Sequence, residues 1–302
     1  MGNNPYRAKW MAWVGLESTY GIPPSFSTSE AIDVYDVSIG EEGEIYKFID
    51  PTKVASFRDA KKLTRKGTIS FRTPLRGDPT SPTPAFRLFQ AAGFNYTTDG
   101  STYTQVDMTT HADSSVAVQL ASGTGIGGND HFIFRLVGAV ASRLTLELEL
   151  GKVAELSVDL VGNIDQKALS TLTDQWHFND SAVLPVRSLT VGTTNWKKAT
   201  FEISASELYE QPDPTDSYGQ GRKLIVTKEA RLTLDPELGA IALPEVEDVF
   251  SDTITVMLDA AQWTISFSGV IDENVGVEVS DGVLVAPITV NLTSLSIKIE
   301  EV

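Results

Sequence analysis

The chain has 302 residues, of which 41% are hydrophobic and 21% charged, values typical of a globular protein with one large or two ordinary domains. It has no cysteine, which excludes disulfides, thiolate metal sites and cysteine nucleophiles. The net charge is −16, no apolar run approaches the ~20 residues of a membrane-spanning helix, and the amino end lacks the pattern of a signal peptide, so we expect a soluble protein.

Alternating apolar and polar residues recur along most of the chain, and this period of two predicts an all-β protein. Thr, Val, Ile and Phe, which suit the pleated surface of a sheet, fill the alternating segments. In chain order the pattern predicts strands at residues 67–72, 116–120, 131–137, 143–150, 154–161, 198–203, 223–227, 230–234, 252–258, 262–267 and 288–300. Residues 32–39 are strand-like as well, and we expect the stretch 40–59 after them to be a long loop.

Only two short helices are expected among these strands. For the first, Thr83 is a suitable N-cap, Pro84 fits the first helical position and Gly93 lies just past the end. Its apolar stripe consists of Ala85, Leu88, Phe89 and Ala92. The second begins at Pro244, with matching spacing at Val246, Val249 and Phe250. Helices this short and few are expected to lie against sheets and not to alternate with strands.

The segment 143–160, RLTLELELGKVAELSVDL, predicts a hairpin of two strands that turns at Gly151 and Lys152. Gly at the first central position would suit a type II′ turn. The Leu and Val residues of both strands then face one core, so the acidic residues between them face away from it. These outward-facing residues are Glu147, Glu149, Glu155 and Asp159, and we expect them to form an unpaired acidic face.

The charge is spread unevenly along the chain. Residues 1–150 carry 14 basic and 16 acidic residues, a balance of −2, whereas residues 151–302 carry 10 and 24, a balance of −14. Basic residues concentrate at Lys53, Arg58, Lys61, Lys62, Arg65, Lys66, Arg72 and Arg76, against the single Asp59. This asymmetry is compatible with solubility alone, or with head-to-tail self-association in which the basic pole of one copy meets the acidic surface of another.

A faint internal repeat suggests a duplication. The segments 62–77 and 223–239 each contain Lys-Leu, an alternating strand, a Pro and a Gly in the same order, and each precedes one of the expected helices. We therefore expect two similar domains, residues 1–170 and residues 171–302. Each would be an antiparallel β-sandwich or barrel with one short helix.

The residues that could carry chemistry do not form a recognisable catalytic or metal-binding motif. Gly123, Gly125 and Gly128 match a dinucleotide-binding spacing, but a strand follows them where a helix is required. The three His are scattered. Glu147 and Glu149, roughly 7 Å apart along a strand, lack the apolar burial that would separate their pKa values as in a glycosidase. We expect no enzyme, no cofactor and no metal site, and the basic cluster lacks the recognition helix of a sequence-specific nucleic-acid binder.

Three stretches of the chain, in this order, carry a family resemblance: WVGLESTYGIPPSFSTSEAIDV (13–34), KKLTRKGTISFRTPLRG (61–77) and PAFRLFQAAGF (84–94). Together they resemble the amino-terminal part of the tail tube proteins of long-tailed bacteriophages, in which an E-T-x-x-G-like opening leads through a long loop to a sheet and to a short helix ending in G-F. At that opening this chain has Glu17, Ser18, Thr19, Tyr20 and Gly21, and Ser18 departs from the pattern. Residues 196–204 and 222–237 look like part of a second copy of such a domain.

The resemblance implies a virion structural protein of the viral tail, assembled in the host cytoplasm. Identical copies would form rings and stack into a tube, and DNA would pass through the bore during ejection without specific binding. Inner sheets of neighbouring copies would join into one barrel around the bore. Two tube domains per chain would make the ring trimeric, and one would make it hexameric. A tape measure protein and a tail terminator are the partners that the family implies.

In such a tube, carboxylates on the wall would let a polyanion slide, because Lys or Arg bound to phosphate would hold it. We therefore expect Glu147, Glu149, Glu155 and Asp159 to face the lumen, although a solvated outer sheet face would have the same pattern. For the contacts between rings and subunits we expect Ile45, Tyr46, Phe48, Ile49, Lys61, Lys62, Arg65 and Lys66. The alternatives are another tail or baseplate component, or a carbohydrate-binding adhesion β-sandwich that stacks sugars on Trp176, Trp196 or Trp263.

Overall fold

The structure is a computed structural model that describes residues 10–26, 31–42, 45–49, 57–62, 66–76, 85, 87–98, 103–111, 115–122, 130–171, 183–191, 194–211, 221–236, 250–258, 261–272, 278–280, 283–285 and 287–301. In this part of the chain one short helix, α1 (Arg87–Ala91), accompanies strands that make up nearly all of the fold. The strands are β1 (Trp10–Leu16), β2 (Ala31–Glu42), β3 (Ile45–Ile49), β4 (Phe57–Lys62), β5 (Lys66–Pro74), β6 (Phe94–Thr98), β7 (Tyr103–His111), β8 (Val116–Ser122), β9 (Asp130–Glu149), β10 (Glu155–Thr171), β11 (Val186–Val191), β12 (Thr194–Gln211), β13 (Arg222–Pro236), β14 (Phe250–Leu258), β15 (Ala261–Ile271), β16 (Glu278–Ser280), β17 (Val283–Val285) and β18 (Ile288–Glu301). The predicted all-β fold is confirmed.

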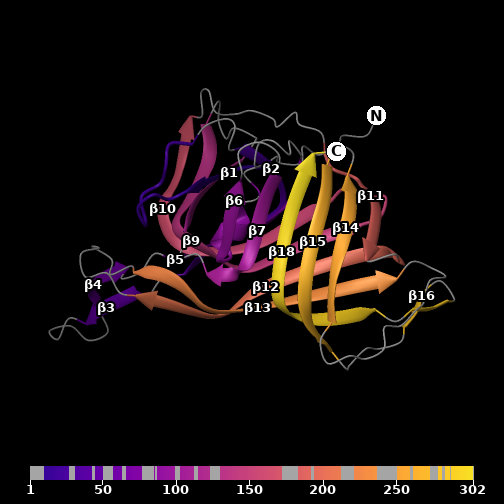
Figure 1. The fold of residues 1–302 in the computed structure, drawn as a ribbon. Coiled ribbons are helices and arrows are strands. Elements are labelled where there is room, and N and C mark those ends of the chain that lie inside the picture. Colours follow the sequence, from indigo (N-terminus) through magenta and orange to yellow (C-terminus); the bar gives the residue numbers. More distant parts are fainter. Residues whose placement is uncertain are drawn as a thin grey trace.

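Fourteen of the strands form one antiparallel sheet that closes on itself twice (Figure 1). The first circuit is a six-stranded barrel in the order β10-β5-β2-β1-β8-β9, closed by pairing of β9 with β10. The second circuit has the order β12-β11-β14-β15-β18-β13, closed by pairing of β13 with β12. Pairing of β9 with β12 joins the two circuits into one sheet, and the hairpin β6–β7 of the first half adds to β18 of the second.

The two circuits have the same order of connections. In each, the first strand (β1 or β11) pairs with the second (β2 or β12) and the fourth (β8 or β14). The third strand (β5 or β13) pairs with the second and the sixth (β10 or β18), and the fifth (β9 or β15) pairs with the fourth and the sixth. The repeated segments of the sequence, 62–77 and 223–239, cover the third strand of each circuit. The division into domains at residues 170 and 171, which falls at the end of β10, stays a prediction.

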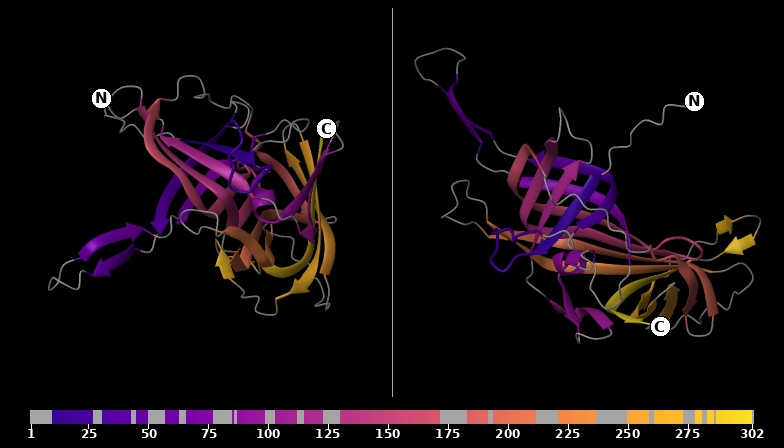
Figure 2. Two further views of the ribbon diagram at one scale, coloured as in Figure 1. Left: turned by 90° about the vertical axis from the view of Figure 1, so that its left-hand side faces the viewer. Right: turned by 90° about the horizontal axis from the view of Figure 1, so that it is seen from above.

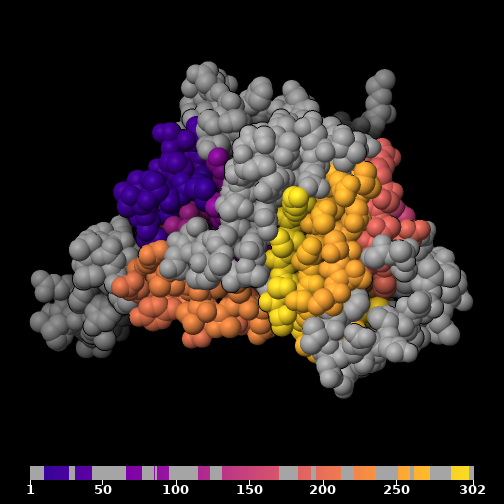
Figure 3. All heavy atoms as spheres, in the orientation of Figure 1, coloured from indigo at the N-terminus to yellow at the C-terminus, as the bar shows by residue number. Residues whose placement is uncertain are grey.

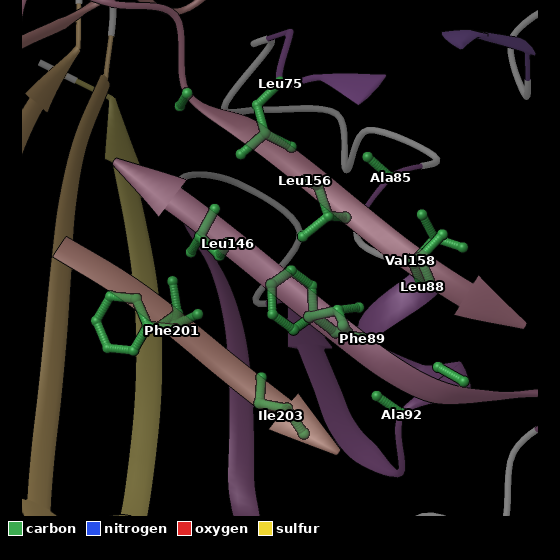
Figure 4. Packing of buried hydrophobic residues seen from close by; sticks show 14 of the residues in the cluster. Leu75, Ala85, Leu88, Phe89, Ala92, Leu146, Leu156, Val158, Phe201 and Ile203 are labelled. Atoms are coloured by element: carbon green, nitrogen blue, oxygen red, sulfur yellow. The ribbon is translucent and has the colours of Figure 1, made fainter. Parts of the chain in front are cut away.

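The larger of two apolar clusters among the described residues contains residues of both circuits, and the smaller one consists of Met11, Trp13, Ala31, Ala121 and Ile133. Leu144, Leu146 and Leu148 of β9 are fully buried, as the alternation of residues 143–150 predicts. Figure 4 shows Leu146, Leu156 and Phe201, from three neighbouring strands, in one layer with Leu88 and Phe89 of α1. The helix therefore covers the sheet near the join between the circuits, where it shields the strands from water.

The first helix begins and ends close to where the sequence predicts it. Thr83 and Pro84 lie outside the described residues, and α1 spans Arg87–Ala91. Gly93 has a φ of 80°, the left-handed conformation expected just past a helix end. Of the second expected helix only Phe250 is described, and it is the first residue of β14, so the helical assignment of Phe250 is wrong.

Two predictions about connections also need correction. The N–H of Lys152 donates to the carbonyl of Glu149 (3.0 Å), so the two central residues of the turn are Leu150 and Gly151. Gly151 is the second of them and has a φ of 76°, which is typical of a type II turn. The predicted type II′ turn, with Gly151 in first place, is therefore wrong. The stretch 40–59 is not a loop throughout, because β2 extends to Glu42 and β3 begins at Ile45. Strand β3 pairs with β4 as a separate two-stranded hairpin.

Tyr20 links the two circuits. Its hydroxyl donates to the carbonyl of Gly221 (3.0 Å) and accepts from the N–H of Lys223 (2.9 Å), both next to or within β13. The carboxylate of Glu17 accepts from the N–H of Gly138 (2.7 Å) and from Ser115 Oγ (2.7 Å). Gly138 bends β9 with a φ of 57° and lies against the Tyr20 ring, where a Cβ would come within 2.4 Å of it.

We expect Gly138→Ala to lower the free energy of unfolding by about 3 kcal/mol or more. The left-handed backbone costs about 1–2 kcal/mol for any residue with a Cβ, and displacement of Tyr20 adds its lost hydrogen bonds, about 1 kcal/mol each. Gly151→Ala is the matched control, since Gly151 also has a positive φ but has no atom within 4 Å of the added Cβ. Urea denaturation of both variants measures the difference, and equal losses would contradict the role given to Tyr20.

Tyr20 also predicts a pH dependence at high pH. Burial raises the pKa of its hydroxyl from 10.0 to about 12. Because the folded value lies above the unfolded one, the contribution of Tyr20 to stability is complete below pH 10 and is lost between pH 10 and 12. Two pKa units correspond to about 2.7 kcal/mol, which solvent screening at this half-buried site reduces to about 1–2 kcal/mol. Tyr20→Phe should lack this part of the fall in unfolding free energy, and parallel pH profiles for the two proteins would refute the assignment.

Candidate functional site

The two circuits share one continuous eight-stranded run of the sheet, in the order β2-β5-β10-β9-β12-β13-β18-β15. One face of this run is buried, and the other carries polar side chains. Residues that lie side by side across the outer face include Pro74, Glu155, Glu147, Thr200, Thr233 and Thr289, each from the next strand. We call this surface the outer face. Figure 3 shows that β13, β18 and β15 adjoin in the space-filling view.

The four carboxylates expected to face a lumen all lie on the outer face. Their neighbours in sequence, Leu146, Leu148, Leu156 and Val158, are buried on the opposite side. Glu155 lies directly opposite Glu147, and Asp159 lies directly opposite Arg143. The alternation therefore placed these residues on one surface, while their position in an assembled tube stays a prediction.

The expectation that these carboxylates are unpaired is wrong for two of them. Glu147 lies between Arg72 of β5 (3.4 Å) and Lys198 of β12 (3.7 Å). Glu149 accepts from Lys152 (2.9 Å), which raises the pKa of that lysine. The partners of Glu147 come from strands far away in sequence, so the local sequence of the hairpin contained no sign of them.

The outer face is therefore mixed in charge, with a small excess of carboxylates. Its acidic residues include Glu42, Glu147, Glu149, Glu155, Asp159, Glu202, Glu229 and Asp235, and its basic residues include Lys66, Arg72, Arg143, Lys198, Arg231 and Lys298, with Lys152 at the turn beside it. Arg143 pairs with Glu202 (2.7 Å). The last three acidic residues were missed as candidates, although Glu202 stands between the apolar Phe201 and Ile203 in the same alternating pattern.

The hairpin β3–β4 holds most of the predicted contact residues. Ile45, Tyr46, Phe48 and Ile49 belong to β3, and Lys61 and Lys62 belong to β4. Tyr46 pairs with Lys61 and Ile45 with Lys62 in the backbone register. Both views of Figure 2 show the hairpin projecting from the body of the molecule, a position that suits contact with another copy.

Three members of the basic cluster are bound within the chain. Lys66 forms an ion pair with Glu210, and its contribution to contacts between copies stays a prediction. Arg72 pairs with Glu147, and Arg76 pairs with Asp33 (2.8 Å). Arg65 lies outside the described residues. The basic charge that projects from the body is therefore that of β3–β4, with Lys47, Arg58, Lys61 and Lys62 against Asp59.

Other candidate chemistry does not come together in the described part of the chain. Within it, no group of His, Asp or Glu is arranged to hold a metal ion, and the Nδ1 atom of His131 contacts the carbonyl of Ser122 (2.6 Å). Gly123, Gly125, Gly128 and His177 are outside the described residues. No described helix is both long and apolar enough to cross a membrane.

The aromatic residues considered for sugar stacking are not available for it where they are described. Trp196 is 7% exposed and Trp263 is 1% exposed, so neither ring offers a face to a ligand. Trp176 lies outside the described residues. No protein-family model and no curated protein matches this chain.

Proposed function

We propose that this chain is a structural protein that assembles into rings and stacks them into a hollow tube of the tail tube type, through which a phage genome is ejected. The resemblance of residues 13–34, 61–77 and 84–94 supplies the family, and the organisation of the strands supports it. In this proposal the chain is not an enzyme and needs no cofactor.

The eight-stranded run of the sheet is the observation that carries the proposal. Each circuit contributes its second, third, sixth and fifth strands to it in the same order, so the run is two equivalent four-stranded units side by side. A wall made of equivalent units can be extended by further copies of the same chain. With two units per chain, three copies would supply six units, which favours a trimeric ring over a hexameric one.

The outer face suits the wall of a DNA conduit better than a DNA-binding surface. Its carboxylates outnumber its basic residues, and Arg72, Arg143 and Lys198 each lie beside a carboxylate. Phosphates gain little from basic groups that are already paired, so counterion release and tight binding are small. Because screening extends only ~8 Å at physiological salt, the charges act only where they lie on the wall itself.

The hairpin β3–β4 supports stacking of the rings. A two-stranded hairpin is at best marginally stable alone in water, and β3–β4 pairs with no strand of the large sheet in the described part of the chain. Its basic charge is complementary to the acidic remainder of a chain with net charge −16. Contact between the hairpin of one ring and the body of the next is heterologous and generates an open filament.

Electron microscopy of the purified, concentrated protein in negative stain tests this proposal. Regular rings or hollow tubes of constant diameter are the expected result. Monodisperse globular particles at all protein and salt concentrations would overturn it. That result would favour the alternatives, a carbohydrate-binding adhesion protein or a baseplate component.

A further inference from the structure

The way in which the two circuits join within one chain indicates how two chains join. The contact between the circuits is made by the last residues of β9, the fifth strand of the first circuit, and by β12, the second strand of the second circuit. The pairing runs from Glu149 opposite Lys198 to Arg143 opposite Ser204. The same contact repeated would bring the fifth strand of a second circuit to the second strand of a first circuit, which is β2 in another copy.

Strand β2 has an edge that can accept this contact. Residues 31–34 pair with β1, and a register shift against β5 follows between Tyr35 and Ser38. Strand β12 is built alike: residues 194–195 pair with β11, a register shift against β13 follows between Trp196 and Lys198, and residues 198–204 then pair with β9. Among the described residues, no strand pairs with the backbone of Ser38–Gly40 on the side of β1, so this short strand edge is the counterpart of the first residues of 198–204.

The matching strand at the other end of the molecule is β16. Strand β9 has 20 residues, and its last residues make the contact. The first residue of β15 is at position 261 and the last residue of β16 is at position 280, so this part of the chain has the same number of residues as β9. The N–H of Asp272 donates to the carbonyl of Thr289 (2.8 Å), which continues the β15–β18 ladder toward the hairpin β16–β17. The counterpart of Glu149 at the end of β9 is therefore Ser280 at the end of β16.

The hairpin β16–β17 is a small sheet to which a further strand could add. It forms a two-stranded sheet of its own in the described part of the chain, and such a hairpin needs further strands for stability. Figure 1 places β16 at the opposite side of the molecule from β3, the strand that follows β2. The two edges therefore lie where a head-to-tail contact between copies requires them.

We propose that β16 of one copy pairs in antiparallel fashion with residues 38–40 of β2 in a second copy, with Ser280 opposite Ser38 and Glu278 opposite Gly40. The inference rests on the proposed assembly into rings and specifies its lateral contact strand by strand. Main-chain hydrogen bonds along an exposed edge give such strand addition its affinity. Because the two surfaces differ, the contact repeats from copy to copy until the ring closes, and the outer face continues around it without a gap.

The absence of native cysteine makes a disulfide test direct. We expect the double variant Ser38→Cys, Ser280→Cys to give reducible dimers and higher oligomers after mild oxidation of the assembled protein. The variant Glu149→Cys, Lys198→Cys is the positive control, since these residues lie opposite each other within one chain and should cross-link without an increase in mass. The variant Ser38→Cys, Ser294→Cys is the negative control, because Ser294 of β18 lies opposite Ser268 of β15 and away from the proposed contact.

The outcomes separate this inference from the proposed function. Rings that form without cross-links between copies in the Ser38→Cys, Ser280→Cys variant would overturn the strand assignment and leave the tube proposal standing. Failure of the wild-type chain to form any ring would overturn the tube proposal itself. As a second test, replacement of residues 273–286 by a short Gly-Ser linker should give a folded monomer that forms no rings and whose circular dichroism is still that of a β protein. Rings from this variant would also refute the inference.

Discussion

The double charge reversal Lys61→Glu, Lys62→Glu is expected to abolish tube growth while the chain remains folded. Both residues lie on β4 of the projecting hairpin, which pairs with no strand of the large sheet among the described residues, so the reversal leaves the core untouched. In the proposed stack the hairpin meets the acidic body of the next ring, and the reversal turns an attraction into repulsion between like charges. Negative-stain microscopy would record single rings in place of tubes, with a melting temperature close to that of the wild type.

A matched control separates the position of the charge from its sign. Lys197 of β12 is exposed and lies outside the hairpin, so Lys197→Glu should leave tube length unchanged. Lys66 is kept in both variants because its ion pair with Glu210 belongs to the fold. Tubes of full length from the Lys61→Glu, Lys62→Glu protein would show that β3–β4 is not the stacking contact.

Reversal of the outer-face charge at Glu155 and Asp159 is expected to slow DNA passage on the order of tenfold while tubes still form. These two residues are chosen because Glu147 and Glu149 hold ion pairs whose loss would confuse the result. Glu155→Lys and Asp159→Lys would place new ammonium groups on every copy around the bore, and each would release counterions on contact with phosphate and hold the DNA. The measurement is the rate of genome ejection from particles assembled with the variant, at two salt concentrations.

The neutral variants Glu155→Gln and Asp159→Asn serve as the control for shape. They remove the charge without adding a phosphate-binding group, so their ejection rate should lie much closer to that of the wild type. The slowing by the Lys variants should weaken at high salt, because screening shortens the reach of the new charges. Equal ejection rates for the Lys, neutral and wild-type proteins would show that the outer face does not line the bore.

The alternation of apolar and polar residues predicted the fold class and the buried face of each strand well, because the period of two depends only on residues that are neighbours in sequence. Leu144, Leu146 and Leu148 are buried as predicted. The pattern predicted two strands at 131–137 and 143–150, whereas β9 continues through Gly138. The apolar alternation is interrupted at Gly138, but the strand does not end there. Gly138 instead takes a positive φ, and the Tyr20 ring packs against it.

The pairing between circuits could not be predicted from the same pattern. Glu147 meets Arg72 from a strand 75 residues earlier and Lys198 from a strand of the other circuit, and alternation contains no information about which strands are neighbours. The hairpin β3–β4 was missed for a different reason. The strands IYKFI and FRDAKK are short and lack a clear alternation of apolar and polar residues. Only β-propensity was left to predict them, and in short strands the tertiary context often overrides propensity.

A cryo-electron microscopy map of the protein assembled at high concentration would show whether the outer face lines the bore of a tube. We expect a hollow tube whose bore is lined by the eight-stranded run β2-β5-β10-β9-β12-β13-β18-β15 of every copy, with Glu147 and Asp159 directed toward the axis. A map of isolated monomers, or of a tube whose bore is lined by the basic hairpin β3–β4, would contradict this expectation.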